Sequence, residues 1–246
     1  MPNSKDLKPQ DSNFKFLILG DYGTGKSSFA ATCPTPGYLF DFDDRAITYK
    51  GKDFDYDTFP ISSQGWVSFE TKLAEVIKAV KDKKYKTVVV DSTSAMTDLA
   101  MQRAMQMDPK RNPVGGPMWN VHYGMVKNLM EGRLLQLINL DCDLVVCCHL
   151  QPERDEDGAI KDYGPLLTGQ LAARVPGYFY EVYIATTKRE RVNIASQNAE
   201  MITKYMLQTV PIGMKKARSA LSGREKILPD FFENDYETLM KLLNKK

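Results

Sequence analysis

A glycine-rich segment near the N-terminus has the residue types and the spacing to bind phosphate. It fits the pattern G-x-x-x-x-G-K-[ST] without a mismatch, as Gly20-Asp21-Tyr22-Gly23-Thr24-Gly25-Lys26-Ser27. Its glycines allow successive backbone N–H groups to face inward as an anion nest, and a helix after them adds the partial positive charge of its N-terminus. We expect Lys26 to reach the β- and γ-phosphates of a nucleotide and Ser27 to offer its hydroxyl to Mg²⁺. Together with Ser28, these residues form the predicted nucleotide-binding loop.

Acidic residues after two later apolar runs could complete such a site. Asp91 follows the run 88–90, where a carboxylate at the end of a neighbouring strand would hold Mg²⁺ through water. The alternative role for Asp91 is the N-cap of the next helix. Asp43, with Asp44 behind it, ends another apolar run and is our candidate for the base that orients and deprotonates water. The alternative for this segment is a solvated acidic turn.

The periodicity of apolar residues predicts the elements that position these side chains. Short apolar runs predict strands over residues 14–19, 38–42, 86–90 and 143–148. Helical spacing predicts helices from the glycine-rich loop up to Pro34, and over residues 66–80, 92–107, 119–140 and 235–243. Residues 50–63 are expected to be irregular with one short strand, 151–169 to be a polar stretch, and 179–187 and 201–208 to be β-rich. The predicted fold class is α/β, with a mostly parallel central sheet flanked by helices and a β-rich C-terminal part.

Length and composition restrict the class of protein. The 246 residues predict a flexible N-terminal tail over residues 1–13 and a single domain over 14–246. The 33 basic and 31 acidic residues give a formal charge of +2, which excludes a polybasic protein. No apolar run approaches the length of a membrane span, and the tail lacks the apolar core of a secretory signal, so we expect a cytoplasmic protein. The four cysteines lack the paired spacing of a zinc site and are expected to be buried.

The arrangement of these motifs resembles the core of RecA-type ATPases over about residues 14–218. The resemblance is closest to the small phage-encoded RecA-like ATPases of single-strand annealing and recombination. It is carried by the acidic end of the second strand, by Asp91-Ser92 after the third, and by His149 at the end of the fourth. A helix that contains Trp119 and a late basic motif, Lys216-Ala217-Arg218-Ser219, complete it.

The resemblance implies an ATPase that uses ATP and Mg²⁺ and is stimulated by single-stranded DNA. His149 stands where RecA has a glutamine that senses the γ-phosphate, although a buried, satisfied histidine is an equal alternative. Lys216 and Arg218 match a Lys-x-Arg that enters the neighbouring subunit's nucleotide site in a homo-oligomeric ring or filament. A surface or DNA-facing basic patch competes with that reading, because residues 188–226 contain nine basic and three acidic side chains.

Two loops are similar in position to the DNA-binding loops of RecA-type proteins. They are residues 108–118, with Lys110 and Arg111, and residues 151–169, with Arg154, Lys161 and Tyr163. The excess of acidic residues weakens the second, and a mobile surface loop is the alternative for each. Two other functions compete with a DNA-stimulated ATPase. One is a nucleotide-switched assembly or loader protein with little turnover, and the other is a small-molecule kinase, which the late Lys-x-Arg fits poorly.

Overall fold

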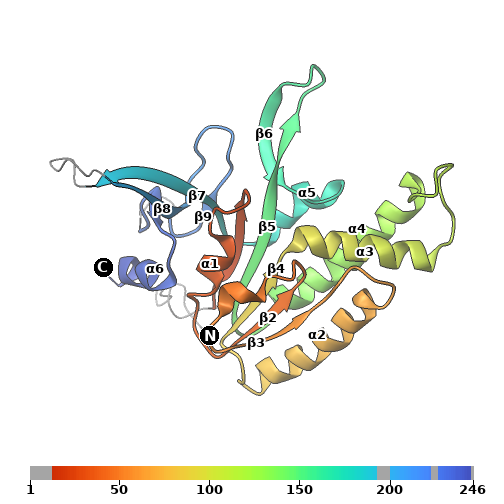
Figure 1. Cartoon of the computed structure of the whole chain (residues 1–246), viewed down its shortest axis with the longest axis horizontal. Coiled ribbons are helices and arrows are strands. Elements are labelled where there is room, and N and C mark those ends of the chain that lie inside the picture. The colour runs from red at the N-terminus through yellow and green to blue at the C-terminus, as the bar shows by residue number, and fades with distance from the viewer. Residues whose placement is uncertain (1–12, 193–199, 223–226, 245–246) are drawn as a thin grey trace, which may run out of the picture.

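A mixed sheet forms the centre of the computed structural model, which describes residues 13–192, 200–222 and 227–244. Within these residues the sheet has ten strands, ordered β10-β8-β7-β1-β5-β4-β2-β3, with β6 paired to β5 and β9 to β7 (Figure 1). The strands are β1 (Lys15–Gly20), β2 (Gly37–Asp41), β3 (Phe54–Thr58), β4 (Thr87–Asp91), β5 (Asp143–Arg154), β6 (Ile160–Pro165), β7 (Glu181–Val192), β8 (Glu200–Gln208), β9 (Arg218–Ser219) and β10 (Phe231–Glu233).

The sheet is parallel at its centre and antiparallel toward the C-terminus. Strands β7, β1, β5, β4, β2 and β3 run parallel to one another, whereas β8, β10, β9 and β6 pair in the antiparallel sense. Strands β2 and β4 are buried along their whole length, because helices cover both of their faces. The predicted mostly parallel sheet with a β-rich C-terminal part is confirmed.

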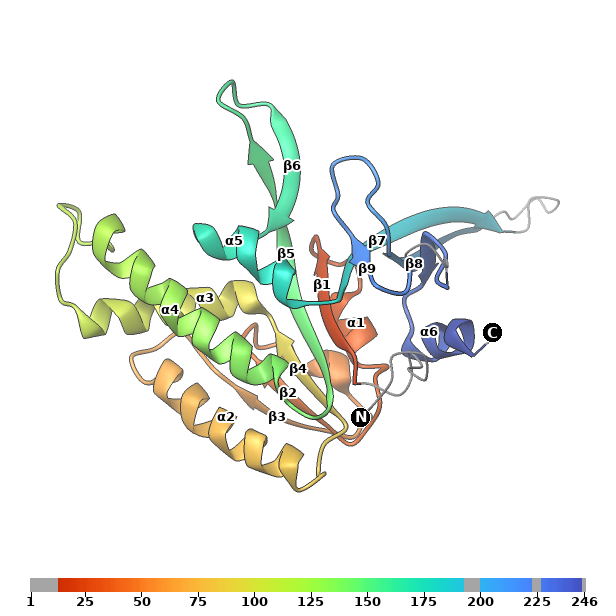
Figure 2. The ribbon, with the colours of Figure 1, turned by 180° about the vertical axis from the view of Figure 1, so that it is seen from behind.

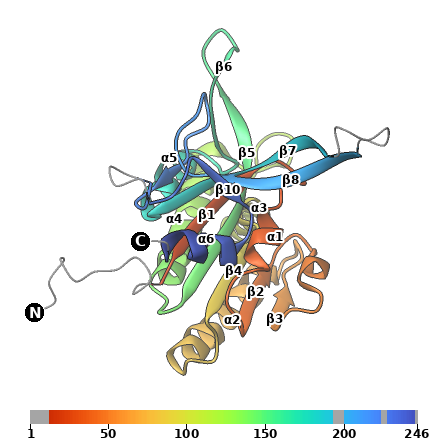
Figure 3. The ribbon, with the colours of Figure 1, turned by 90° about the vertical axis from the view of Figure 1, so that its left-hand side faces the viewer.

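Helices cover the two faces of the sheet unequally. The α-helices are α1 (Lys26–Ala30), α2 (Gly65–Lys81), α3 (Thr93–Met107), α4 (Trp119–Ile138), α5 (Gln170–Arg174) and α6 (Tyr236–Leu243), and short 3₁₀ turns are η3 (Ala46–Tyr49) and η4 (Val175–Tyr178). Helices α2, α3 and α4 lie together on one side (Figure 2), and α1 and α6 lie on the other (Figure 3). Each side has its own apolar cluster, and the central strands β1, β2, β4, β5 and β7 bury side chains in both of them.

The first helix is shorter than the sequence suggests. A helix up to Pro34 is wrong, because α1 ends at Ala30 and the chain turns through Thr32 and Cys33, whose N–H groups donate to Phe29 and Ala30. The other predicted helices are found within a few residues of their expected ends. Residues 1–12 of the predicted tail lie outside the described residues.

The polar stretch 151–169 is a second difference from the sequence prediction. Strand β5 continues past His149 to Arg154, and β6 returns antiparallel to it, with Pro152 opposite Tyr163. This hairpin projects away from the body of the molecule (Figure 1). Most of its outer residues are exposed, so it lacks the alternation of apolar and polar side chains that marks a half-buried strand. The hairpin also contains prolines and glycines, which are uncommon inside strands and therefore weaken a strand prediction from sequence.

No helix in the described parts of the chain has both the length and the apolar character needed to cross a membrane. All four cysteines are buried with free thiols, as expected from their spacing.

An aromatic cluster under α2 gives a stability prediction. The ring of Phe69 is fully buried and contacts the rings of Phe40, Phe42, Phe59 and Trp66 at centroid distances of 5.2–5.7 Å. Replacing Phe69 with Ala should lower the free energy of unfolding by about 3–5 kcal/mol, because it removes apolar contacts and leaves a cavity.

The matched control is Val67→Ala on the exposed face of the same helix. Its free energy of unfolding should differ from that of wild type by no more than about 0.5 kcal/mol, apart from a small gain in helix propensity. Urea denaturation measures both variants. Equal stabilities for the two would contradict the placement of Phe69 in the core.

Candidate phosphate-binding site

The carboxyl ends of four parallel strands meet at one edge of the sheet and bring the predicted residues together. Register pairs Gly20 at the end of β1 with His149 in β5, and Asp41 at the end of β2 with Asp91 at the end of β4. In open α/β sheets this edge is where ligands bind, next to the strand at which the order reverses. Strand β1 has that position, since its neighbours β5 and β7 both come much later in the chain.

The loop between β1 and α1 has the backbone conformation of a phosphate cradle. Gly23 and Gly25 have φ angles of +70° and +92°, a region that favours glycine over residues with a side chain. A Cβ atom on Gly25 would lie 2.4 Å from Nδ2 of Asn234 and 2.9 Å from the ring of Tyr205, so the loop is also closely covered from outside. Glycine is therefore required at position 25 by backbone conformation and by space.

Lys26 is buried at the base of this loop, and its ammonium group has three partners. Nζ donates to the carbonyl oxygens of Gly20 at 3.0 Å and Asp21 at 2.9 Å, and lies 3.2 Å from Nδ1 of His149. Burial lowers the pKa of Lys26 from its usual value, although the nearby carboxylates of Asp91 and Asp43 oppose that shift. A bound phosphate would offer this cation a better partner than the carbonyl groups do.

Asp91 faces the loop from the end of β4. Its carboxyl group is almost fully buried, and burial raises its pKa, while the hydroxyl of Ser27 lowers it in part. The alternative role as a helix N-cap is filled by its neighbour, since the hydroxyl of Ser92 accepts a hydrogen bond from Ala95 N at 3.5 Å and Ser92 is the N-cap of α3. The hydroxyl of Ser27 and the carboxyl group of Asp91 are therefore neighbours at this edge of the sheet.

Asp43 and His149 lie beside the lysine. Nε2 of His149 is 3.9 Å from Oδ2 of Asp43, and the exposed ring of Tyr22 covers the imidazole at a centroid distance of 4.2 Å. Burial acts to raise the pKa of Asp43, but the neighbouring His149 and Ser92 side chains outweigh it and hold the pKa below its usual value. Asp43 is therefore ionised at neutral pH.

A carboxylate that the sequence analysis did not single out fixes the turn carrying Asp43. Asp41 is buried, and its oxygens accept hydrogen bonds from the N–H groups of Asp43, Arg45 and Ala46 at 3.0–3.2 Å. Asp44, expected behind Asp43, is exposed with a φ of +55°. The cluster Asp41-Phe42-Asp43-Asp44 was visible in sequence, but its inner and outer members could not be told apart there.

Two residues from the C-terminal part of the chain, one in β8 and one directly after β10, also contact the glycine-rich loop. Nδ2 of Asn234 donates to the carbonyl oxygen of Gly25 at 2.7 Å, and Tyr205 in β8 lines the cleft over the loop. Both lie about 180 residues or more from the loop in the chain, and no motif marks them. Only the antiparallel extension of the sheet past β7 brings them there.

Two clefts meet at this edge of the sheet. One of about 230 Å³ is lined by the glycine-rich loop with Asp43 and Asp91, and the other of about 360 Å³ lies between α3 and the base of the β5–β6 hairpin. They share Tyr22, Asp43, Arg45 and His149. The first contains the glycine-rich loop with Lys26, and the second adjoins it at the four shared residues.

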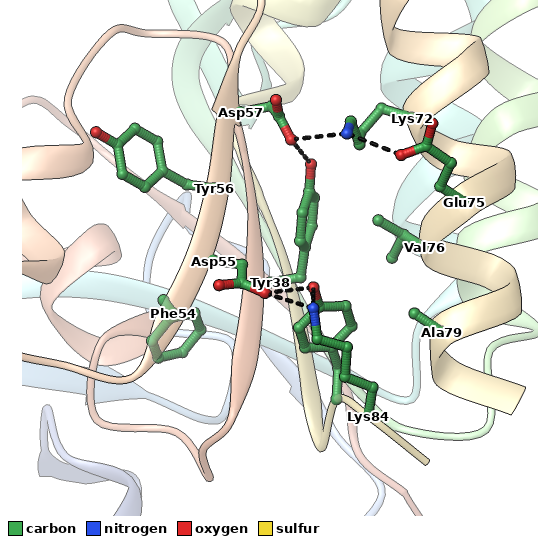
Figure 4. A pocket seen from close by; sticks show the side chains of 11 residues that line it. Tyr38, Phe54, Asp55, Tyr56, Asp57, Lys72, Glu75, Val76, Ala79 and Lys84 are labelled. Atoms are coloured by element: carbon green, nitrogen blue, oxygen red, sulfur yellow. Dashed lines mark hydrogen bonds and ion pairs between the residues drawn. The ribbon is translucent and has the colours of Figure 1, made fainter. Parts of the chain in front are cut away.

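A larger cleft of about 550 Å³ lies at the far edge of the sheet, between β3 and α2 (Figure 4). Its carboxylates are already paired, Asp57 with Lys72 at 3.5 Å and Asp55 with Lys84 at 2.8 Å. The hydroxyls of Tyr38 and Tyr85 also donate to these aspartates. This cleft has no cradle of backbone N–H groups, and its size therefore does not make it the phosphate site.

Lys216 and Arg218 do not join the site of their own chain. Nζ of Lys216 pairs with the carboxylate of Asp162 in β6, which raises the pKa of Lys216. The guanidinium of Arg218 in β9 donates to the carbonyl oxygens of Pro176, at 2.8 Å, and Phe179. Both side chains are exposed, and neither lines the two clefts at the glycine-rich loop.

Comparison with known proteins identifies the family to which this chain belongs. A family model described as an AAA domain matches residues 12–218. A search of curated protein sequences gave no significant match to this chain. Among solved structures, a KaiC-like protein from the hyperthermophilic archaeon Pyrococcus horikoshii is similar, with 13% sequence identity and a TM-score of 0.41 over 79% of this chain and 78% of that one.

The burial of Asp91 gives a prediction about stability and pH. Replacing Asp91 with Asn should leave the free energy of unfolding near pH 7 unchanged or raise it by about 1 kcal/mol, because the amide avoids the cost of burying a charge. The pKa of Asp91 is higher in the folded than in the unfolded chain. The contribution of Asp91 to the free energy of unfolding is therefore favourable at acid pH, and it is lost as pH rises from the unfolded pKa to the folded pKa.

The stability difference between Asp91→Asn and wild type should therefore become less favourable to the variant as pH falls toward about 3. Urea denaturation of the nucleotide-free protein across this pH range measures it, with the exposed Asp44→Asn as the control. If the stability of Asp91→Asn relative to wild type were lower at pH 7 than at acid pH, the raised pKa of Asp91 would be contradicted.

Proposed function

The chain belongs to the AAA domain family of P-loop ATPases, and from this premise we propose that it binds ATP with Mg²⁺ and hydrolyses it to ADP and phosphate. The observation that carries the proposal is the convergence of a phosphate cradle, a buried lysine and two unlike carboxyl groups at one edge of the sheet. Asp91 is buried with a raised pKa, and Asp43 has a lowered one. Such a divergence of environments assigns different tasks to the two groups.

The residues present fit a magnesium nucleotide. The hydroxyl of Ser27 and the carboxylate of Asp91 are oxygen ligands of the kind that Mg²⁺ prefers, and the positive φ angles of Gly23 and Gly25 suit a loop whose backbone N–H groups surround a phosphate. When bound, Mg²⁺ neutralises charge on the phosphates. Lys26 and the N–H groups of the loop would hold the phosphates, and Asp91 would hold the cation directly or through water.

Asp43 is the residue that we assign to the attacking water. It is ionised and lies at the junction of the phosphate cleft and the more open neighbouring cleft. A carboxylate with a lowered pKa is a weak base, so its main task is to orient the water rather than to remove its proton early. His149 contacts both Asp43 and Lys26. It would lose its contact with Lys26 if the lysine moved to a phosphate.

We further propose that the partner of this ATPase is single-stranded DNA, in phage recombination, annealing or replication. The resemblance to phage-encoded RecA-like ATPases supports the DNA partner, as do the basic residues of β7 and β8, of which Arg189 and Arg191 are exposed. The continuity of β5 from His149 into a projecting hairpin also supports it, because that hairpin offers a mechanical link from the nucleotide to a surface.

The same resemblance supports a homo-oligomer in which Lys216 and Arg218 approach the nucleotide of a neighbouring copy. Their exposure is what such a contact requires. A cation that arrives from a second copy would stabilise the transition state and make hydrolysis depend on assembly. Each side chain would first have to leave its present partner, Asp162 for Lys216 and the carbonyl groups of Pro176 and Phe179 for Arg218.

A second candidate is a nucleotide-switched assembly protein with little turnover. The bond between Lys26 Nζ and His149 Nδ1 favours it, because a bound phosphate would draw the lysine away and free the histidine at the base of the hairpin. Nucleotide binding without hydrolysis would then break the contact between Lys26 and His149 at the base of the β5–β6 hairpin. This candidate predicts tight ATP binding with turnover that DNA does not change.

Replacing Lys26 with Ala should reduce Mg²⁺-dependent ATP hydrolysis by about 100-fold or more, because the cation that contacts the phosphates is lost. Steady-state phosphate release, measured with and without single-stranded DNA, tests this. The exposed Lys50→Ala is the matched control and should keep wild-type turnover. In parallel, Arg218→Ala tests dependence on a second copy.

The outcomes separate the candidates. DNA-stimulated turnover that both Lys26→Ala and Arg218→Ala abolish supports the ATPase with a trans-acting arginine. Binding of ATP with turnover that is unaffected by DNA favours the switch. Wild-type turnover in Lys26→Ala would refute the proposed site.

A further inference from the structure

An exposed tryptophan lies on a half-buried tyrosine at the end of the α3–α4 helix pair, far from the phosphate cleft. The indole of Trp119 is 72% exposed and lies against the ring of Tyr123, one turn along α4, with centroids 4.5 Å apart. The helix pair projects from the body on the side opposite the β7–β8 ribbon (Figures 1 and 2). Apolar side chains at the same tip are exposed too, Val114 at 91% and Met107 at 53%.

The loop that carries this platform, residues 108–118, is held by its own hydrogen bonds. Oδ1 of Asn112 accepts from the N–H groups of Val114 and Gly116 at 3.1 and 2.8 Å. The buried imidazole of His122 joins the two ends of the loop, since its Nδ1 accepts from Met118 N at 2.8 Å and its Nε2 is 3.0 Å from the carbonyl oxygen of Asp108. Trp119 therefore starts α4 at a fixed position.

The charges around the platform favour an anionic ligand. Residues 99–130 contain four basic side chains and a single carboxylate, Asp108. Arg111 is committed to the fold, because its guanidinium donates to the carbonyl oxygens of Met105, Asp108 and Lys110 at 2.7–3.0 Å. Lys127 follows Tyr123 by one turn, and within the part of the chain that the structure describes neither Lys110 nor Lys127 forms an ion pair.

We propose that Trp119 and Tyr123 form a stacking platform for the bases of single-stranded nucleic acid, with Lys110 and Lys127 beside its phosphates. The exposed indole of Trp119, supported by Tyr123, offers a face on which any base can stack, and unpaired cations would hold the backbone without reading its sequence. The inference rests on the DNA partner proposed above and assigns that partner to named side chains. An apolar protein partner would not need the excess of positive charge.

The chain carries a built-in reporter for this contact. It has two tryptophans, Trp66, which is 1% exposed, and Trp119. An oligothymidylate of about 20 nucleotides should quench the emission of Trp119 by stacking and should protect it from acrylamide. Trp119→Phe leaves only the buried Trp66, so the response of the emission to the oligonucleotide should disappear.

Affinity is measured separately, by anisotropy of a labelled oligothymidylate with and without ATP. Trp119→Ala should weaken binding by about 5- to 150-fold, the loss expected for one stacked base, and Trp119→Phe should recover part of it. Tyr56→Ala, at an exposed tyrosine of β3, is the matched control and should bind as wild type does. ATP hydrolysis without DNA should be unchanged in Trp119→Ala.

Each contrary result has a distinct meaning. If Trp119→Ala binds the oligonucleotide as tightly as wild type does, the platform is refuted while the DNA partner stands. If the wild-type protein does not bind it in either nucleotide state, the platform and the DNA partner both fall, and the ATPase proposal is unaffected. If Trp119 is protected from acrylamide in an oligomer before any DNA is added, the platform is a contact between copies, which also overturns the inference.

Discussion

The buried ammonium group of Lys26 is the constraint on which the site depends. A cation without partners is costly inside a protein, so the surroundings must supply acceptors. The glycine-rich loop does so with two of its own carbonyl oxygens, and His149 supplies a ring nitrogen. A bound triphosphate would compete for the same cation. The fold therefore holds a charge for which a phosphate would be a better partner, and a movement of Lys26 toward that phosphate would change the contacts of His149.

The sheet makes this arrangement possible because β1, β2 and β4 end at a common edge and β5 passes through it at His149. Parallel pairing places Gly20 beside His149 and Asp41 beside Asp91, and each strand enters from a separate part of the chain. The buried strands fix these positions, since both faces of the sheet are packed against helices. The carboxyl groups can then differ in function, because Asp91 lies inside the edge and Asp43 lies on a turn that Asp41 holds toward the cleft.

Three projections extend from this edge and from the helices beside it. The β5–β6 hairpin begins at His149, the β7–β8 ribbon begins beside Tyr205, and the α3 helix begins at Ser92, next to Asp91. Each element therefore has one end at the carboxyl edge of the parallel strands, and its other end projects away from the body of the molecule (Figure 1). A bound nucleotide would have short covalent routes to these surfaces, although only an element with two arrangements can transmit a change.

The sequence by itself determined the phosphate-binding loop, the strand that ends at Asp91 and the α/β class. These features are local, since glycine spacing and apolar periodicity depend on residues within about ten positions of one another. It left Asp91 with two possible roles, and the structure gives one of them, the N-cap of α3, to Ser92 instead. Only the tertiary structure decided that residues 151–165 form a hairpin and that Asp41 supports Asp43. It also placed Tyr205 and Asn234 over the loop and kept Lys216 and Arg218 away from their own cleft. These contacts join segments distant in the chain, and they follow from strand order and burial, which no local pattern encodes.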